Sequence, residues 1–229
     1  LSLVGSEMCI RDSLHYHRLL AEEETELRVL PSFRPDKALN VDKEGFKQWV
    51  TALAEETEQP ITTYAQFIEA LGQRVDYFHQ HGCRVSDHAL DTLRYAEADE
   101  EQLEAIFQKA LAGKPLEKAD IDAYRTETLS RLFQFYHSYK WTMQLHIHAY
   151  RNCNTRMFET LGPDTGYDGI NDLSLTVPLQ QLLDRAESTD QLPKTILYSL
   201  NPNDYPIITA LMGLSLIHIS EPTRLRRIS

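Results

Sequence analysis

The stretch MQLHIHAYRN, residues 143–152, decides the fold. Its first seven residues, 143–149, alternate apolar side chains with polar ones, which is the period of a β-strand whose two faces meet different surroundings. Three side chains that can do chemistry, His146, His148 and Arg151, lie at the end of this run. The pattern predicts a strand that carries functional groups at its carboxyl end.

Three further β-type runs lie outward from this strand, at residues 27–30, 83–86 and 195–200. Helical periodicity fills the intervals, over residues 43–57, 63–79, 100–111, 117–139, 177–186 and 204–212. Strands that alternate with helices predict βα units and a parallel sheet, so the expected fold class is α/β. The intervals are longer than the roughly 30 residues of a minimal βα unit, which predicts extra helices in the connections.

Two α/β architectures fit this pattern. Four strands are too few to close an eight-stranded barrel within this chain, and a doubly wound open sheet is equally compatible with the alternation. No Gly-x-Gly-x-x-Gly motif follows any of the runs, which disfavours a dinucleotide-binding site.

Composition excludes several classes of protein. The 229 residues are 42% hydrophobic and 25% charged, as in ordinary soluble globular domains, and the net charge is −11. This acidic balance argues against a general nucleic-acid or anionic-membrane binder. The three cysteines do not form a disulfide framework, and no apolar run approaches the roughly 18 residues of a membrane span. The sequence has no signal-peptide pattern, so a cytoplasmic location is expected.

The two ends of the chain differ from the rest. Residues 1–13 and 214–229 have no periodic pattern that continues into their neighbours, and both resemble translations of sequencing-adapter DNA. We therefore exclude them from functional reasoning and treat residues 14–213 as the core. The alternative is a native basic tail, in which Arg224, Arg226 and Arg227 would bind an anion.

Polar side chains follow each of the four predicted strands. In chain order they are Arg34, then Asp87 and His88, then His146, His148 and Arg151, and finally Asn201 and Asp204. In barrels and open α/β sheets, active sites are built at the carboxyl ends of the strands. The sequence therefore predicts a functional site at this edge of the sheet.

Most of these residues also have a structural interpretation. Arg34 could pair with Asp36 on the surface, and Asp87 could be the N-cap of a following helix. Asp204 fits a helix N-terminal residue better than a catalyst. His88 could equally be a packed or a surface imidazole.

The pair His146 and His148 could share a metal, because residues i and i+2 of a strand point to one face. His-x-His is weak evidence by itself, however. The same spacing recurs at residues 15–17 and 79–81.

Four segments together resemble the uronate isomerase family, which belongs to the metal-dependent amidohydrolase superfamily. They are VLPSFRPDKA (29–38), HGCRVSDHALD (81–91), MQLHIHAYRNCNTRMFETLGPDTGYD (143–168) and LPKTILYSLNPND (192–204). They occur in the family's order and run across the whole core, which is more specific than any single motif.

The resemblance implies a partial (β/α)8 TIM barrel, with about four of eight strands and extra helical insertions, and residues 14–213 as its central part. It also implies isomerisation of D-glucuronate to D-fructuronate, and of D-galacturonate to D-tagaturonate, in hexuronate catabolism. The expected partner is a hexuronate small molecule, without nucleic acid or membrane. The full-length parent could be a homo-oligomer, but the sequence does not fix its oligomeric state.

By likeness, Asp87, His146 and Arg151 match catalytic positions, and Arg34 and Arg151 match substrate-binding positions. Arginine suits the substrate carboxylate through two parallel charge-assisted hydrogen bonds, or it stabilises enediolate charge. His146 could relay a proton, and Asp87 could orient it or handle a proton itself.

A divalent metal, for which we expect zinc, is implied for the full-length parent. The family's metal-binding His-x-His lies on the first barrel strand and its Asp on the last, so no metal ligands are expected in this chain and the chain alone is expected to be inactive. His148 stands where the family usually has glycine, and we expect it to narrow the pocket or to add a proton donor.

Two other functions stay open. A metal-dependent hydrolase of the same superfamily would carry a further set of metal ligands or a bridging lysine. A helical interaction module would present apolar stripes to solvent and would not bring Arg34, Asp87, His146 and Arg151 together.

Overall fold

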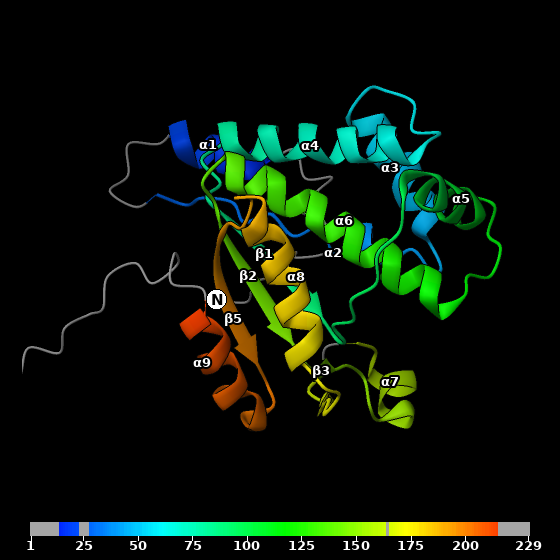
Figure 1. The fold of residues 1–229 in the computed structure, drawn as a ribbon. Helices are drawn as coiled ribbons and strands as arrows, with labels where there is room; N and C mark the ends of the chain where they lie inside the picture. The colour runs from blue at the N-terminus through cyan, green and yellow to red at the C-terminus, as the bar shows by residue number, and fades with distance from the viewer. Residues whose placement is uncertain (1–13, 23–27, 164, 215–229) are drawn as a thin grey trace, which may run out of the picture.

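A parallel three-stranded sheet lies at the centre of the computed structural model, which describes residues 14–22, 28–163 and 165–214. The strands are β1 (Val85–Leu90), β2 (Thr142–Ile147) and β5 (Lys194–Ser199), and they pair in that order with every bond parallel (Figure 1). The α/β class and the parallel sheet expected from the sequence are therefore confirmed.

Helices fill the connections between the strands. They are α1 (His15–Glu22), α2 (Asp36–Leu39), α3 (Phe46–Glu56), α4 (Tyr64–Gln80), α5 (Glu100–Leu111), α6 (Lys118–Ser138), α7 (Thr155–Leu161), α8 (Thr176–Ser188) and α9 (Tyr205–Leu214), with a short 3-10 turn, η1 (Pro202–Asp204), before α9. A small antiparallel pair, β3 (Ala149–Tyr150) and β4 (Gly169–Ile170), follows β2. Across the described ranges, no helix has both the length and the apolar character that a membrane span requires.

The strand predicted at residues 27–30 is wrong over its described part. Residues 28–30 adopt no regular structure, and Val29 and Leu30 are exposed. Pairing occurs three residues later instead, where Phe33 forms an isolated parallel bridge with Ser86 of β1. Phe33 is the better partner because its ring is fully buried against Phe78, Tyr136 and Trp141. Residue 27, and the adapter-like residues 1–13 and 215–229, lie outside the described residues.

The two faces of the sheet have different surroundings. On β2, Met143, Leu145 and Ile147 are buried on the side where α6 packs, and Thr142, Gln144 and His146 on the other side are half-buried. We call this second side the open face. Alternate residues of a strand point to opposite faces, so the alternation seen in the sequence reflects one covered and one open side.

The covering helices are fixed by local signals and by one buried ion pair. Capping boxes begin α4, at Thr63 with Gln66, and α5, at Asp99 with Gln102. Glu127 of α6 is almost fully buried and accepts two hydrogen bonds, of 2.7 and 2.8 Å, from the guanidinium of Arg185 in α8. These bonds raise the pKa of Arg185, so its charge is permanent and α8 is tied to α6.

His88 of β1 points to the covered side, so it is the packed imidazole that the sequence left as one alternative. The side chain is fully buried, its ring lies 5.6 Å from that of Tyr136, and neither ring nitrogen has a hydrogen-bond partner among the described residues. Burial, and then the charge of Arg34, lower the pKa of His88 to about 3. The imidazole is therefore neutral at physiological pH and serves the core.

We predict that His88 makes stability depend on pH. The unfolded chain takes up a proton at His88 near pH 6.5 and the folded chain does so only near pH 3, so stability is complete above pH 6.5 and falls as the pH drops through this window. The slope from one such group is about 1.4 kcal/mol per pH unit. The measurement is the free energy of unfolding from urea titrations at several pH values between 3 and 6.5. For His88→Leu, this free energy should change less steeply with pH than for the wild type, by roughly the amount given above.

The matched control is His15→Leu, because His15 is exposed on α1. Its slope should equal that of the wild type. An unchanged slope in His88→Leu would show that His88 does not resist protonation in the folded chain.

Candidate active site

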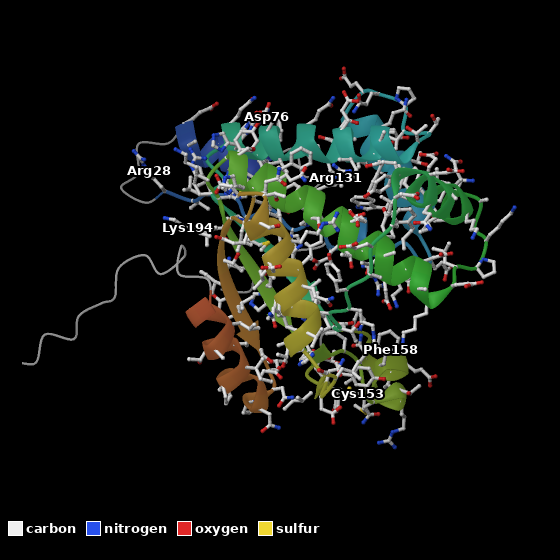
Figure 2. The ribbon with its side chains drawn as sticks, in the orientation of Figure 1. Arg28, Asp76, Arg131, Cys153, Phe158 and Lys194 are labelled. Atoms are coloured by element: carbon white, nitrogen blue, oxygen red, sulfur yellow. The ribbon has the colours of Figure 1, made fainter. Side chains whose placement is uncertain are left out.

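The parallel register places the candidate residues beside one another on the open face. Asp87 of β1 lies opposite Gln144 of β2, and His146 of β2 lies opposite Tyr198 of β5. Paired residues of neighbouring parallel strands point to the same face, so these side chains converge. Figure 2 shows the amino end of β5 at Lys194, and Cys153 and Phe158 beyond the opposite, carboxyl end of the sheet.

Asp87 and His146 form the centre of the site. Nδ1 of His146 lies 2.6 Å from Oδ1 of Asp87, and the His146 side chain keeps 45% of its surface exposed. Nη1 of Arg34 lies 3.3 Å from the other oxygen of Asp87. The carboxylate of Asp87 is thus shared between a permanent cation and an imidazole. Asp87 is a residue within β1, so the helix N-cap alternative is wrong.

Asp36 holds Arg34 from the other side. Its Oδ2 accepts a 2.7 Å hydrogen bond from Nε of Arg34, and its Oδ1 accepts a 3.1 Å bond from the backbone N–H of Ala89. Burial raises the pKa of Asp36, and Arg34 opposes this rise. The Arg34–Asp36 pair suggested by the sequence therefore forms, but it also ties the loop before α2 to β1 and presents Arg34 to Asp87.

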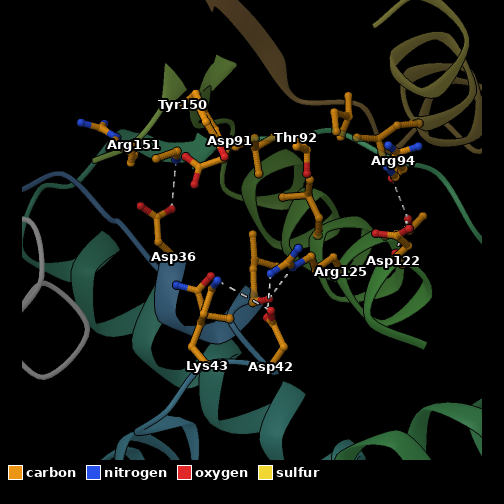
Figure 3. A pocket seen from close by; sticks show the side chains of 18 residues that line it. Asp36, Asp42, Lys43, Asp91, Thr92, Arg94, Asp122, Arg125, Tyr150 and Arg151 are labelled. Atoms are coloured by element: carbon orange, nitrogen blue, oxygen red, sulfur yellow. Dashed lines mark hydrogen bonds and ion pairs between the residues drawn. The ribbon is translucent and has the colours of Figure 1, made fainter. Parts of the chain in front are cut away.

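A pocket of about 400 Å³ shares Asp36 with this cluster, but Arg34, Asp87 and His146 do not line it. Figure 3 shows Asp36 and Arg151 among its lining residues. Arg125 and Asp42, which also line it, are paired at 2.7 Å. Burial raises the pKa of Asp91 in the lining, against the opposing charge of Arg151. The pocket carries acidic and basic side chains in mixture, which suits a polar ligand with hydroxyl and carboxylate groups.

Arg151 lies in the turn after β3 and is one of the residues that line this pocket. Its Nη1 donates a 2.9 Å hydrogen bond to Asp168, and the other oxygen of Asp168 accepts one from the backbone N–H of Asn152. The structure therefore brings Arg34, Asp87 and His146 into direct contact and places Arg151 beside the pocket with Asp36. The catalytic and binding roles of these residues stay predictions.

The expectation that His148 shares a face with His146 is wrong. β2 ends at Ile147, and His148 has φ +64°, in the left-handed region that L-residues with side chains rarely adopt. Its side chain is fully buried, and Nδ1 lies 2.7 Å from Oδ2 of Asp204. His148 therefore neither narrows the pocket nor donates a proton on the open face.

Asp204 is the helix N-terminal residue that the sequence favoured, since it lies in η1 immediately before α9. Its Oδ2 accepts hydrogen bonds from both His148 and Ser199. Asn201 caps η1, because its side chain accepts from the backbone N–H of Asn203. Asn201 and Asp204 thus fix the turn after β5.

No cluster of three or more His, Cys, Asp or Glu side chains that could hold a metal exists within the part of the chain that the structure describes. The weaker alternative, in which His146 and His148 share a metal, does not fit the geometry, because the two imidazoles pair with different carboxylates, Asp87 and Asp204.

Sequence reasoning missed Tyr198 and underrated Asp36. Tyr198 lies two residues after Ile196 on the same, exposed side of β5. This period of two was the available signal that Tyr198 belongs to the open face. Asp36 was visible in the segment FRPD, but its bond to Ala89 joins residues 53 positions apart, which no local pattern reveals.

Comparison with known proteins gives one consistent result. The family model described as glucuronate isomerase (UxaC) matches residues 7–220. The chain is 50% identical over 202 residues to the uronate isomerase of Bacillus pumilus, covering 88% of this chain and 42% of that protein. It is 47% identical over 203 residues to that of Caldicellulosiruptor saccharolyticus, covering 88% and 44%. The chain thus spans less than half the length of the curated relatives it matches.

Solved structures agree. The crystal structure of uronate isomerase from Thermotoga maritima superposes with a TM-score of 0.81 at 32% identity, over 88% of this chain and 44% of that one. The glucuronate isomerase of Caulobacter crescentus superposes with a TM-score of 0.77, over 86% and 40%; at 24% identity this likeness concerns the fold alone.

We predict that His148→Gly destabilises the chain despite relieving its strained backbone. Removing one partner of a buried pair costs about 3–5 kcal/mol, and glycine, which adopts the left-handed conformation without steric cost, returns about 1–2 kcal/mol. Ser199 still bonds Asp204, so the net loss should be about 2 kcal/mol in urea unfolding.

His148→Ala separates the two effects. It loses the same pair but keeps a side chain at positive φ, so it should be less stable than His148→Gly by about 1 kcal/mol. A His148→Gly chain as stable as the wild type would contradict the prediction, because the pair with Asp204 would then contribute no more than the about 1–2 kcal/mol of backbone strain that glycine relieves.

Proposed function

This chain belongs to the glucuronate isomerase family, and we propose that the protein of which it is part interconverts D-glucuronate and D-fructuronate, and D-galacturonate and D-tagaturonate. The observation that carries the proposal is the contact of Asp87 with both Arg34 and His146 on the open face of the sheet. A helical interaction module gives no reason for these three residues, which are far apart in the sequence, to meet.

We propose that the three strands and the Phe33 bridge are part of a (β/α)8 barrel, with residues 14–213 as its central part and the two ends foreign to it. Consecutive parallel strands with helices on one side suit a barrel wall, whose inner side would be the open face. Ile196 and Tyr198 on that side keep 42% and 41% of their surface exposed, as expected of residues that face a barrel interior.

His146 is the candidate proton carrier. Aldose–ketose isomerisation moves a proton between C2 and C1, which requires a group that can accept and return it at neutral pH. Nδ1 of His146 and Oδ1 of Asp87 lie 2.6 Å apart without the geometry of a hydrogen bond, and the negative charge of the carboxylate favours the tautomer with the proton on Nδ1. Nε2 then carries the lone pair, so Asp87 orients the imidazole as a base.

The two arginines are candidates for the anionic parts of the substrate. Arg34 is held by Asp36 and Asp87, so its guanidinium is fixed in position before any ligand binds. Arg151 lines the pocket and keeps 38% of its side-chain surface exposed. The reaction requires that the substrate carboxylate be bound and that the negative charge of the enediolate be stabilised. One arginine could serve each requirement.

The residues that the structure describes offer no metal site of their own. The family resemblance supports a divalent metal, with zinc as our expectation, in the full-length parent, where its ligands would lie outside this chain. A bound divalent ion there would polarise substrate oxygens. The partner we propose is a hexuronate small molecule, in the cytoplasm.

We predict that residues 14–213 can replace the matching segment of the Bacillus pumilus uronate isomerase and leave a working enzyme, since the two are 50% identical there. In this chimera, His146→Asn should lower kcat/KM by at least about 100-fold, because a positioned acid–base group contributes about 10²–10⁴. The measurement is conversion of D-glucuronate and of D-galacturonate, each assayed separately.

The matched control is His15→Asn, an exposed histidine on α1, which should leave kcat/KM within about twofold. A chimera that melts cooperatively yet converts neither sugar acid would rule out the proposed function. Full activity in the His146→Asn chimera would leave the isomerase assignment standing and remove His146 from the chemistry.

A further inference from the structure

We propose that Tyr198 is a positioning residue that holds the imidazole of His146 against Asp87. The inference rests on the proposed function for its catalytic meaning, and on geometry alone for its structural part. Nothing in the sequence pattern pointed to this residue beyond its place on the open face.

The two rings are stacked. The centroids of His146 and Tyr198 lie 4.5 Å apart, and the ring planes differ by 7°. The two residues are direct partners in the parallel register of β2 and β5, so the backbone fixes the relative positions of their Cα atoms. The torsion angle about the Cβ–Cγ bond of a histidine normally has a broad distribution. Stacking on a flat neighbour restricts this rotation of the imidazole.

Tyr198 is itself anchored at its far end. Its hydroxyl donates a 3.1 Å hydrogen bond to Oε1 of Gln144, which precedes His146 by two residues and shares its face of β2. The tyrosine ring is therefore fixed by the strand at one end and by Gln144 at the other. It lies as a rigid plate beside the imidazole.

Asp87 and Tyr198 restrain the imidazole in different ways. Asp87 contacts the edge at Nδ1, and Tyr198 covers one ring face. Nε2 has no hydrogen-bond partner among the described residues, and the side chain keeps 45% of its surface exposed. With the edge and one face held, the remaining nitrogen keeps a constant direction, which is what a proton-transferring group requires.

A merely space-filling Tyr198 would make a different prediction. It would contribute to stability, but the orientation and tautomer of His146 would follow from Asp87 alone. The ratio of the two neutral tautomers of His146 separates the two possibilities, because only an oriented ring keeps Nδ1 on the carboxylate.

The experiment uses the full 229-residue chain labelled with ¹⁵N. Long-range ¹H–¹⁵N correlation spectra at about pH 8, where histidine is normally neutral, give the ratio of the Nδ1–H to the Nε2–H tautomer. His146→Gln assigns the signals. We expect Tyr198→Leu to lower this ratio at least about threefold, and Tyr198→Phe, which keeps the stack, to restore it to within about twofold of the wild type.

The matched control is Tyr205→Leu, since Tyr205 is an exposed tyrosine at the start of α9, and its ratio should equal that of the wild type. An unchanged ratio in a folded Tyr198→Leu chain overturns the proposal, and so does an equal loss in Tyr198→Phe and Tyr198→Leu. If Tyr198→Leu does not fold, the wild-type spectrum still decides, because stacking must shift the ring protons of His146 upfield. The absence of that shift overturns the proposal.

These outcomes are separate from those of the isomerase test. A stacked, oriented His146 in a protein whose chimera converts no sugar acid would contradict the proposed function and keep the positioning role of Tyr198. An active chimera whose His146 is unstacked would do the reverse.

Discussion

The parallel register of β1, β2 and β5 is the constraint on which the candidate site depends. It sets Asp87 beside Gln144 and His146 beside Tyr198, so four side chains from three strands share one face without any loop to position them. A slip of one residue in β2 would turn His146 into the covered side and bring Leu145 or Ile147 to the open face. Burial of Met143, Leu145 and Ile147 on one face of β2 fixes the register, and this register keeps the polar residues of β2 on the open face.

Contacts between opposite charges also hold the side chains of this face in position. One guanidinium, that of Arg34, contacts two carboxylates, and one of these, Asp87, also contacts an imidazole. Asp36 is fixed by the backbone of Ala89, so the arrangement begins at the main chain of β1 and ends at the exposed imidazole of His146. Groups that are held before a ligand arrives lose little entropy when it binds, and this is the physical value of carboxylates that never touch the ligand.

The elements with strong local signals could be predicted from the sequence. Residues 100–111 were expected to be a helix and α5 has those bounds, because a capping box begins it and apolar spacing continues it. The strands β2 and β5 were placed to within one or two residues by their alternation. The run at residues 27–30 was misleading, since short apolar segments look like strands whether or not a neighbour pairs with them. The short α2 and α7, and the β3–β4 pair, depend on tertiary contacts and were not expected.

The site divides in the same way. Arg34, Asp87 and His146 could be found because polar residues at the ends of strands stand out against apolar runs. Tyr198 could not, because an aromatic residue on a strand is ordinary and its meaning comes from the ring stacked on it from another strand. His148 shows why alternation fails at a strand end: positive φ turns the chain at that residue, so the i+2 rule no longer applies. Glycine suits that conformation without cost, whereas a histidine there needs a compensating contact. The buried pair with Asp204, in the turn that follows β5, is that contact. It joins the chain just beyond β2 to the chain just beyond β5, while His146 and Tyr198 join the two strands on the open face.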